Sequence, residues 1–193
     1  MVFLIDDLRF TDNLRANLRN FSKFFSQNSN FFCIFASEFM ILELHNISIG
    51  ASVRGVSATV GTGSVLAISG EQGTGKTTLL RALLGFIATD EGHISIDGEL
   101  LTTLSAPFFR RQMAYVPQGL TVPEGYDDVP TDYMRLLEHG VHAGKQLIII
   151  DEPPTPLTED NRMRRERLIS EAAERGATVV AVNTSVTQNV VRL

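Results

Sequence analysis

The sequence contains a single cysteine, no apolar run long enough to cross a membrane, and no excess of basic residues. Cys33 is the only thiol among 193 residues, so no intramolecular disulfide can form, which fits a reducing compartment. A membrane-spanning helix needs about 20 consecutive apolar residues. The net charge of -5 and the pI near 5.4 argue against a general nucleic-acid binder, whose surface is usually basic. A globular protein with no nucleic-acid partner is therefore expected.

The chain divides near Met40 into two segments of different character. Residues 1–39 contain nine of the twelve phenylalanines and neither glycine nor proline. Their apolar stretch FFCIFA, at residues 31–36, is short for a secretory signal and follows a long polar stretch, so we expect no such signal. We expect a Phe-rich appended extension, either disordered or lying ahead of the natural start at Met40.

A second interpretation of this N-terminal segment stays open. Arg15, Arg19 and Lys23 recur every four residues, which places them on one face if the segment is helical. Such a helix would lie on a surface or bind a partner.

From Met40 onward the sequence has the alternating pattern of an α/β domain. Residues 41–49 alternate apolar and polar, as in a half-buried strand, and residues 52–60 predict a second strand. A helix is predicted from the apolar stripe between Leu79 and Ile87. Shorter apolar strands are predicted at residues 65–69, 93–98, 113–117, 146–151 and 177–183. This order predicts a mostly parallel central sheet flanked by helices, with antiparallel strands near the start of the domain.

A charged helix is predicted at residues 159–175, where basic and acidic residues are mixed. We expect a solvated face for its arginines: Arg162, Arg164, Arg165 and Arg167. The histidines predict no metal site, and we expect them on the surface: His93, His139 and His142.

The stretch GEQGTGKTT at residues 70–78 fits the phosphate-loop pattern G-x-x-x-x-G-K-[ST] between a predicted strand and a predicted helix. Glycines let the backbone fold around phosphate with its N–H groups pointing inward. The Lys76 ammonium would bind the β- and γ-phosphates, and the Thr77 hydroxyl would bind magnesium. We therefore predict a nucleotide-phosphate site formed by Gly70, Gly73, Gly75, Lys76, Thr77 and Thr78.

Two adjacent carboxylates follow the apolar strand LIII. Asp151, at the carboxyl end of this strand, is expected to bind magnesium. Glu152 is the next residue, so its side chain points to the other side and could polarise an attacking water. Such a base favours hydrolysis of the nucleotide over phosphoryl transfer to a small acceptor molecule. An acidic pair that merely caps the sheet is the alternative.

Three further stretches resemble the ATP-binding cassette (ABC) family, the nucleotide-binding subunits of ABC transporters and members of the P-loop NTPases. They are EGHISIDGEL at residues 91–100, RRQMAYVPQ at 110–118 and LIIIDEPPTPL at 147–157. Order and reading frame agree with the family from about residue 41 to residue 184. The resemblance implies that Gln118 contacts magnesium or the attacking water.

The departures from the family pattern are specific. No stretch between residues 119 and 146 resembles the LSGGQ-like signature, and the long helical subdomain is reduced to room for one helix at 131–142. Thr158 stands where the family has its D-loop aspartate. Thr184, or Asn183 if the register slips, stands in place of the switch histidine. No aromatic residue occupies the stretch directly after the first strand, where adenine usually stacks in the family.

The retained residues act within one subunit in the family, whereas the signature and the D-loop act across a subunit interface. The resemblance therefore implies that residues 40–193 form an ATP-binding subunit of an ABC-type transporter. It would bind ATP with Mg²⁺ and hydrolyse it slowly, or only with a second ATP-binding subunit that supplies the signature. A membrane-spanning permease would be the other partner. The ATP-binding subunit would then be cytoplasmic, peripheral on the inner face of the plasma membrane.

Two alternatives remain. One is a non-hydrolysing nucleotide-binding regulatory module or degenerate relative of the family. The other is a P-loop enzyme outside the transporter group, which the stretches YVPQ and DEPPTPL disfavour.

Overall fold

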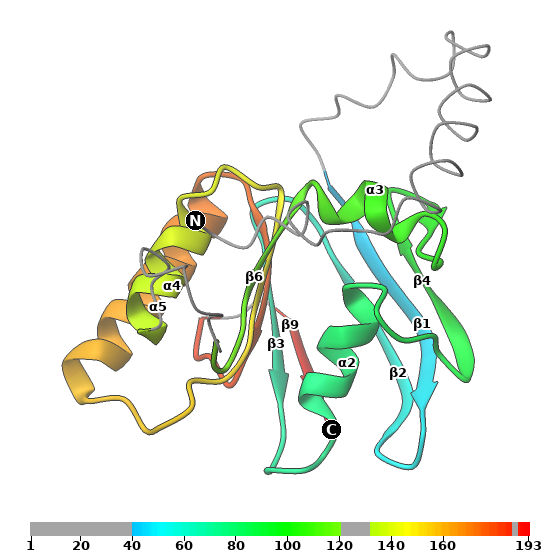
Figure 1. Ribbon diagram of the computed structural model, residues 1–193, viewed down its shortest axis with the longest axis horizontal. Helices are drawn as coiled ribbons and strands as arrows, with labels where there is room; N and C mark the ends of the chain where they lie inside the picture. Colours follow the sequence, from blue (N-terminus) through cyan, green and yellow to red (C-terminus); the bar gives the residue numbers. More distant parts are fainter. Residues whose placement is uncertain (1–39, 121–131, 187–188) are drawn as a thin grey trace, which may run out of the picture.

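The computed structural model describes residues 40–120, 132–186 and 189–193, which form two sheets and four helices (Figure 1). The predicted extension at residues 1–39 lies outside these ranges. The smaller sheet is antiparallel, with the strand order β2-β1-β4-β5. Its strands are β1 (Leu42–Ile49), β2 (Val53–Val60), β4 (Glu91–Ile96) and β5 (Glu99–Leu100).

The larger sheet is parallel throughout, with the strand order β6-β7-β8-β3-β9. Its strands are β3 (Val65–Ser69), β6 (Met113–Val116), β7 (Leu147–Ile150), β8 (Thr178–Val182) and β9 (Asn189–Arg192). Strand β8 therefore lies between β3, which leads into the phosphate loop, and β7, which leads into the two carboxylates.

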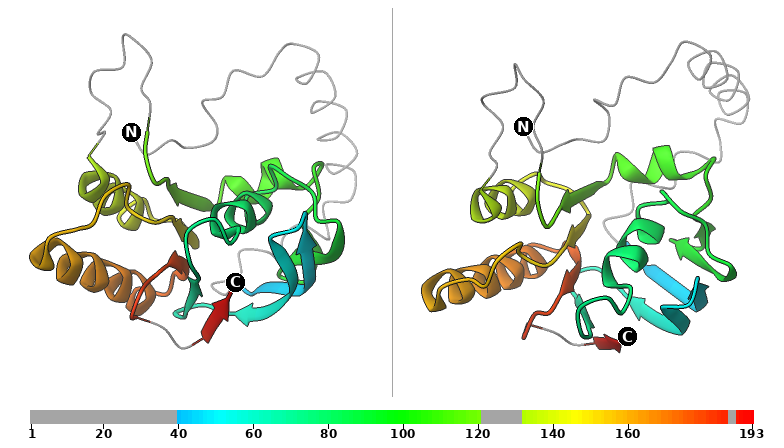
Figure 2. Two further views of the ribbon diagram at one scale, coloured as in Figure 1. Left: turned by 90° about the horizontal axis from the view of Figure 1, so that it is seen from below. Right: turned by 60° about the horizontal axis from the view of Figure 1, so that its bottom comes forward.

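The described helices are α2 (Lys76–Leu83), α3 (Ala106–Arg110), α4 (Tyr133–Val141) and α5 (Glu159–Glu174). Helices α4 and α5 lie side by side on one face of the parallel sheet, and α2 lies on the other face, between the two sheets (Figures 1 and 2). Within the described ranges, none of the helices has both the length and the apolar character needed to cross a bilayer.

Two hydrophobic cores form on the two faces of the parallel sheet, because successive strand residues point to opposite sides. Ile149 on β7 packs in the core with α2 and the antiparallel sheet. Its neighbours Ile148 and Ile150 pack in the other core, with α4 and α5. Burial on both faces explains why these strands are apolar throughout. The predicted fold class is confirmed.

Helix α2 is shorter than the apolar stripe that predicted it. The stripe runs to Ile87, but the helix ends at Leu83. Gly85 adopts a positive φ of 68°, and the Phe86 N–H donates to the Arg81 carbonyl at 2.9 Å, which closes the helix end. The structure also contains β5, α3 and β9, all too short to give a periodic signal.

One expectation for α5 is wrong. Arg165 is buried, with 3% of its surface exposed, whereas Arg162, Arg164 and Arg167 are exposed as expected. The reason is that Arg165 lies on the face of α5 that packs against the sheet, together with the buried Leu168 and Ile169. The three histidines singled out in the sequence are exposed: His93, His139 and His142.

Candidate nucleotide-binding site

The phosphate loop connects the end of β3 to the start of α2, as the sequence predicts. Gly75, directly before the helix, has a φ of 97°, and a Cβ there would lie 2.8 Å from Val53 Cγ2. A Cβ on Gly70 would lie 2.6 Å from Thr74 Oγ1. Gly73 also has a positive φ, of 86°, although a Cβ there would meet open space. The loop therefore depends on glycine for its conformation at Gly75 and Gly73 and for space at Gly70 and Gly75.

Lys76 is held inside this loop. Its side chain is 7% exposed, and its Nζ donates hydrogen bonds to the carbonyl oxygens of Gly70 and Glu71, at 2.8 and 2.7 Å. Lys76 is also the first residue of α2, so its ammonium group adds to the positive end of the helix dipole. Backbone N–H groups, helix dipole and ammonium together suit the binding of phosphate.

Thr77 and Asp151 meet although they lie on different elements. The Thr77 hydroxyl donates to Asp151 Oδ2 at 3.2 Å, and Asp151 is 2% exposed. The Tyr115 hydroxyl donates to the same carboxylate oxygen at 3.3 Å. Burial, then the negative charge of Asp151 and this hydrogen bond, raise the pKa of Tyr115, so the phenol keeps its proton.

The oxygen atoms of Thr77 and Asp151 fit a magnesium ion that also binds phosphate. Mg²⁺ prefers oxygen ligands and usually takes one or two from the protein, with water and phosphate completing its shell. Among the described residues, no group of three or more His, Cys, Asp and Glu side chains could hold a metal by itself. The donor set therefore suits a metal bound together with nucleotide.

Glu152 points away from Asp151, as predicted. Its backbone N–H donates to Asp151 Oδ1 at 2.8 Å, while its own Oε1 accepts from Asn183 Nδ2 at 3.0 Å. Its Oε2 lies 3.6 Å from Lys76 Nζ, and the side chain is 41% exposed. The two adjacent carboxylates thus have separate partners, one buried and one open to solvent.

The strand order explains why these residues meet. The carboxyl ends of parallel strands lie at one edge of a sheet, where α/β proteins bind ligands. At this edge the Asn183 N–H donates to the Ile68 carbonyl of β3 at 2.9 Å, and the Asp151 N–H donates to the Val116 carbonyl of β6 at 2.9 Å. Asn183 follows the central strand β8 and so lies between the phosphate loop and the carboxylates.

Two of the predicted site residues lie at this edge without joining the network. Gln118 is exposed, two residues beyond β6, and within the described part of the chain no hydrogen bond links it to Asp151 or Glu152. Thr78 is half-buried within α2.

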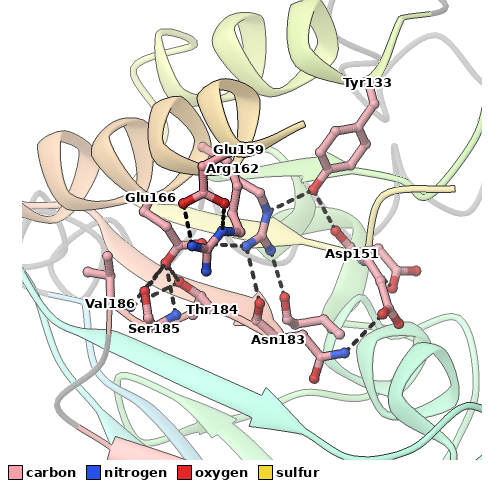
Figure 3. A network of polar contacts seen from close by, with 12 residues as sticks. Tyr133, Asp151, Glu159, Arg162, Glu166, Asn183, Thr184, Ser185 and Val186 are labelled. Atoms are coloured by element: carbon pink, nitrogen blue, oxygen red, sulfur yellow. Dashed lines mark hydrogen bonds and ion pairs between the residues drawn. The ribbon is translucent and has the colours of Figure 1, made fainter. Parts of the chain in front are cut away.

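The structure distinguishes the two positions left open for the switch histidine. Thr184 turns away from the phosphate loop and donates to Glu166 Oε2 on α5, at 2.6 Å. Asn183 has a positive φ of 48°, and its side chain contacts Glu152. Asn183 is therefore the residue that faces the carboxylate. Figure 3 shows these opposite directions.

Sequence reasoning missed three residues of the site. Tyr115 lies on β6 inside the stretch YVPQ, where only Gln118 was singled out. The Tyr133 hydroxyl donates to the Asp151 backbone carbonyl at 2.8 Å. Arg165 Nε donates to the Tyr133 hydroxyl at 3.2 Å. No spacing rule connects Tyr133 with Arg165, because they lie on different helices.

A family model described as ABC transporter matches residues 53–130. This range includes the phosphate loop and Gln118 but ends before Asp151. Over this range, which is less than half of the chain, the sequence is similar to the ABC transporter family. Domains of this family bind ATP, generally with Mg²⁺, are generally ATPases, and work with membrane permease components.

The relatives include import and flippase proteins. The chain is 42% identical over 83 residues to the "Fe(3+) ions import ATP-binding protein FbpC" of Pseudomonas fluorescens, covering 40% of this chain and 23% of the relative. It is 40% identical over 73 residues to the "ATP-dependent lipid A-core flippase" of Methylococcus capsulatus, covering 38% of this chain and 12% of the relative. The chain thus spans less than a quarter of the length of these two relatives.

Solved structures agree on the fold. An ATP-binding subunit of an ABC transporter matches with a TM-score of 0.64 and 18% identity, covering 79% of this chain and 85% of that one. An ATP-binding ABC protein of Pyrococcus furiosus matches with a TM-score of 0.58, 17% identity, and coverage of 79% of this chain and 97% of that one.

Proposed function

We propose that residues 40–193 act as the ATP-binding subunit of an ABC-type transporter, binding MgATP at the carboxyl edge of the parallel sheet. One observation carries the proposal: Lys76 and Thr77 of the phosphate loop lie within contact of Asp151 and Glu152, although β8 separates their strands. Oxygen donors, a buried ammonium group and a solvent-accessible carboxylate are the groups that an ATP site needs.

In this proposal different residues bind the phosphates and the magnesium ion. Lys76 and the loop backbone from Gly70 to Gly75 bind the β- and γ-phosphates, and Thr78 continues the helix that points at them. Thr77 and Asp151 hold Mg²⁺, which would neutralise charge on these phosphates. Gln118 would approach the metal or the water from the end of β6 once nucleotide is bound.

Glu152 is the proposed general base. As the oxygen of a water forms a bond to the γ-phosphorus, the bond from that phosphorus to the bridging oxygen of ADP breaks, and Glu152 takes the proton of the water. Asn183 holds one carboxylate oxygen, at 3.0 Å, and leaves the other toward Lys76. Asn183 carries no charge, so it would stabilise the transition state less than a protonated histidine would.

The proposed partners follow from what this subunit lacks. No signature-like stretch occurs in residues 119–146, and Thr158 in the D-loop position caps α5, its Oγ1 accepting the N–H of Asn161 at 3.3 Å. A second ATP-binding subunit would therefore supply the signature. By analogy with the import and flippase relatives, a membrane-spanning permease is the other partner, which would place the subunit in the cytoplasm at the inner face of the plasma membrane.

A second candidate function is a non-hydrolysing nucleotide-binding module. The observation that favours it is the uncharged Asn183 beside a Glu152 that is 41% exposed, because both weaken catalysis without affecting the phosphate loop. ATP binding is common to both candidates, and turnover separates them.

Calorimetric titration of the full chain with MgATP tests the proposal. Lys76→Ala removes charge-assisted hydrogen bonds to phosphate and should weaken binding by at least about 100-fold. Arg81→Ala, an exposed cation on the same helix, is the matched control and should bind like wild type. Equal binding by the Lys76→Ala variant would refute the site. Turnover by wild type equal to that of Glu152→Gln would leave only the non-hydrolysing module.

We also propose that residues 1–39 are an appended extension that takes no part in nucleotide binding. Deleting them should leave the MgATP affinity unchanged. A loss of affinity would show that the extension contributes to the domain.

A further inference from the structure

We infer that Tyr133 and Arg165 are positioning residues that fix the peptide bond between Asp151 and Glu152, and thereby direct the Asp151 carboxylate toward magnesium. The inference rests on the proposed MgATP site. Neither residue belongs to the phosphate loop or to the adjacent carboxylates, and the network that they form is shown in Figure 3.

The first link runs from α4 to the end of β7. Tyr133 is the first residue of α4 and is 6% exposed. Its hydroxyl proton goes to the Asp151 carbonyl at 2.8 Å, so its oxygen is left to accept the hydrogen bond from Arg165 Nε at 3.2 Å.

The second link runs from α5 to the end of β8. One terminal nitrogen of Arg165 donates to the Val182 carbonyl at 2.6 Å, and the other donates to the Asn183 carbonyl at 3.3 Å. These bonds hold the backbone of Asn183, whose side chain binds Glu152 at 3.0 Å. Asp151 and Glu152 are thus tied to one guanidinium by two routes, through Tyr133 and through Asn183.

Stability alone does not account for Arg165. A buried charge loses its hydration, and a well-packed apolar side chain of similar volume is often as stable in such a place. The neighbouring inward residues of α5, Leu168 and Ile169, are apolar. The guanidinium pairs with Glu166 Oε1 at 2.8 Å, and it also adds directed donors to Tyr133 and to the two carbonyls at the end of β8.

The hydrogen bonds that run from Arg165 through Tyr133 to Asp151, and through Asn183 to Glu152, are called the relay. The relay makes magnesium binding depend on the position of α4. This helix follows Gln118 and precedes β7 in the chain, and it packs against α5 and β6. A shift of α4 would move the Tyr133 hydroxyl away from the Asp151 carbonyl. The peptide bond that sets the direction of the Asp151 carboxylate would then no longer be fixed.

The test compares ATP affinity in excess Mg²⁺ with ATP affinity in a chelator, for the full chain and its variants. Tyr133→Phe keeps the ring and removes only the hydroxyl. It should reduce the gain in affinity that Mg²⁺ gives by about tenfold, the loss typical of an outer-shell partner of a metal ligand, with Mg²⁺-free affinity unchanged. Arg165→Met should act in the same direction. Arg162→Met, an exposed arginine of the same helix, should leave the gain as in wild type.

The outcomes distinguish a failure of the relay from a failure of the proposed ATP site. If wild type fails to bind ATP in either condition, the proposed function fails. If wild type shows a gain with Mg²⁺ and Tyr133→Phe shows the same gain, the relay is refuted. If Tyr133→Phe weakens binding equally with and without Mg²⁺, its effect is a general loss of structure and the relay is also refuted. Melting temperatures of the Tyr133→Phe and Arg165→Met variants show whether each is folded at the temperature of the ATP titrations.

Discussion

The carboxylate of Glu152 lies 3.6 Å from the ammonium group of Lys76, so the proposed base and the proposed phosphate-binding cation form an ion pair across the site. A triphosphate that approaches Lys76 also meets the negative charge of Glu152. The same carboxylate that would activate water therefore opposes nucleotide binding.

Glu152→Gln should accordingly raise MgATP affinity. Removing one partly exposed charge from this pair should give about a two- to fivefold gain, and the gain should shrink as salt screens the charge. Titrations at low and high ionic strength measure both effects. Glu159→Gln, an exposed carboxylate at the start of α5, is the control. Unchanged affinity of the Glu152→Gln variant at low salt would show that the ion pair has no bearing on binding.

The opposite directions of Asn183 and Thr184 predict which position accepts a histidine. Asn183→His should raise ATP turnover about tenfold, because a protonatable donor replaces a neutral one beside Glu152. Histidine also tolerates the positive φ of 48° at this position. Thr184→His should leave turnover unchanged and lower the melting temperature, since it breaks the hydrogen bond to Glu166. The reverse result would mean that Thr184 is the residue that faces the nucleotide.

Glu166 predicts a pH-dependent contribution to stability. Its burial alone would raise its pKa, but hydrogen bonds from Thr184 and Ser185 and the charge of Arg165 outweigh this, and the pKa lies below the ordinary value of 4.5. A lowered pKa in the folded state means that the contribution is present above the unfolded-state value. It is lost as the pH falls through the folded-state value.

Glu166→Gln should therefore lower the free energy of unfolding at pH 7 by about 3 kcal/mol, because Arg165 would remain buried without its countercharge. The difference from wild type should diminish below the ordinary pKa of 4.5. Urea unfolding at neutral and acid pH measures it, with Glu99→Gln, at an exposed carboxylate of β5, as the control. A difference of the same size at both pH values would contradict the assignment to the ionised carboxylate.

Two substitutions of Thr158 are expected to differ in their effect on the free energy of unfolding. Its Oγ1 accepts the N–H of Asn161 at 3.3 Å and caps the first turn of α5. Thr158→Ala should cost about 1 kcal/mol of unfolding free energy, whereas Thr158→Asp retains a capping oxygen and should stay within about 0.5 kcal/mol of wild type. Equal stability of the Ala and Asp variants would show that the cap is not used. The Asp variant also places the family's acid in the D-loop position.

The strands and the phosphate loop could be predicted because their signals are local. Apolar strands, the glycines around Lys76 and the acidic pair after β7 can each be recognised within about ten residues of sequence. The helix predicted at 131–142 was found as α4 (Tyr133–Val141), with Asp132 as its cap. Thr131 lies outside the described residues.

The polar network behind the site could not be predicted, because its residues come from separate elements. The stretch RMRRER reads as solvated on either face of a helix, and only the fold shows that Arg165 meets Tyr133 and the carbonyls at the end of β8. The direction of Asn183 likewise depends on a left-handed backbone conformation, which sequence spacing does not reveal. Short β9 gave no periodic signal, although it pairs with β3.

The strand order also constrains how the domain can be made on the ribosome. Among the strands that the structure describes, β3, which leads into the phosphate loop, pairs only with β8 and β9. Both neighbours are synthesised after all the other described strands. The nascent phosphate loop therefore has no sheet to anchor it until β8 has left the exit tunnel. Because such distant pairing forms slowly, the apolar strand β3 stays unpaired and prone to misfolding at least until β8 has emerged.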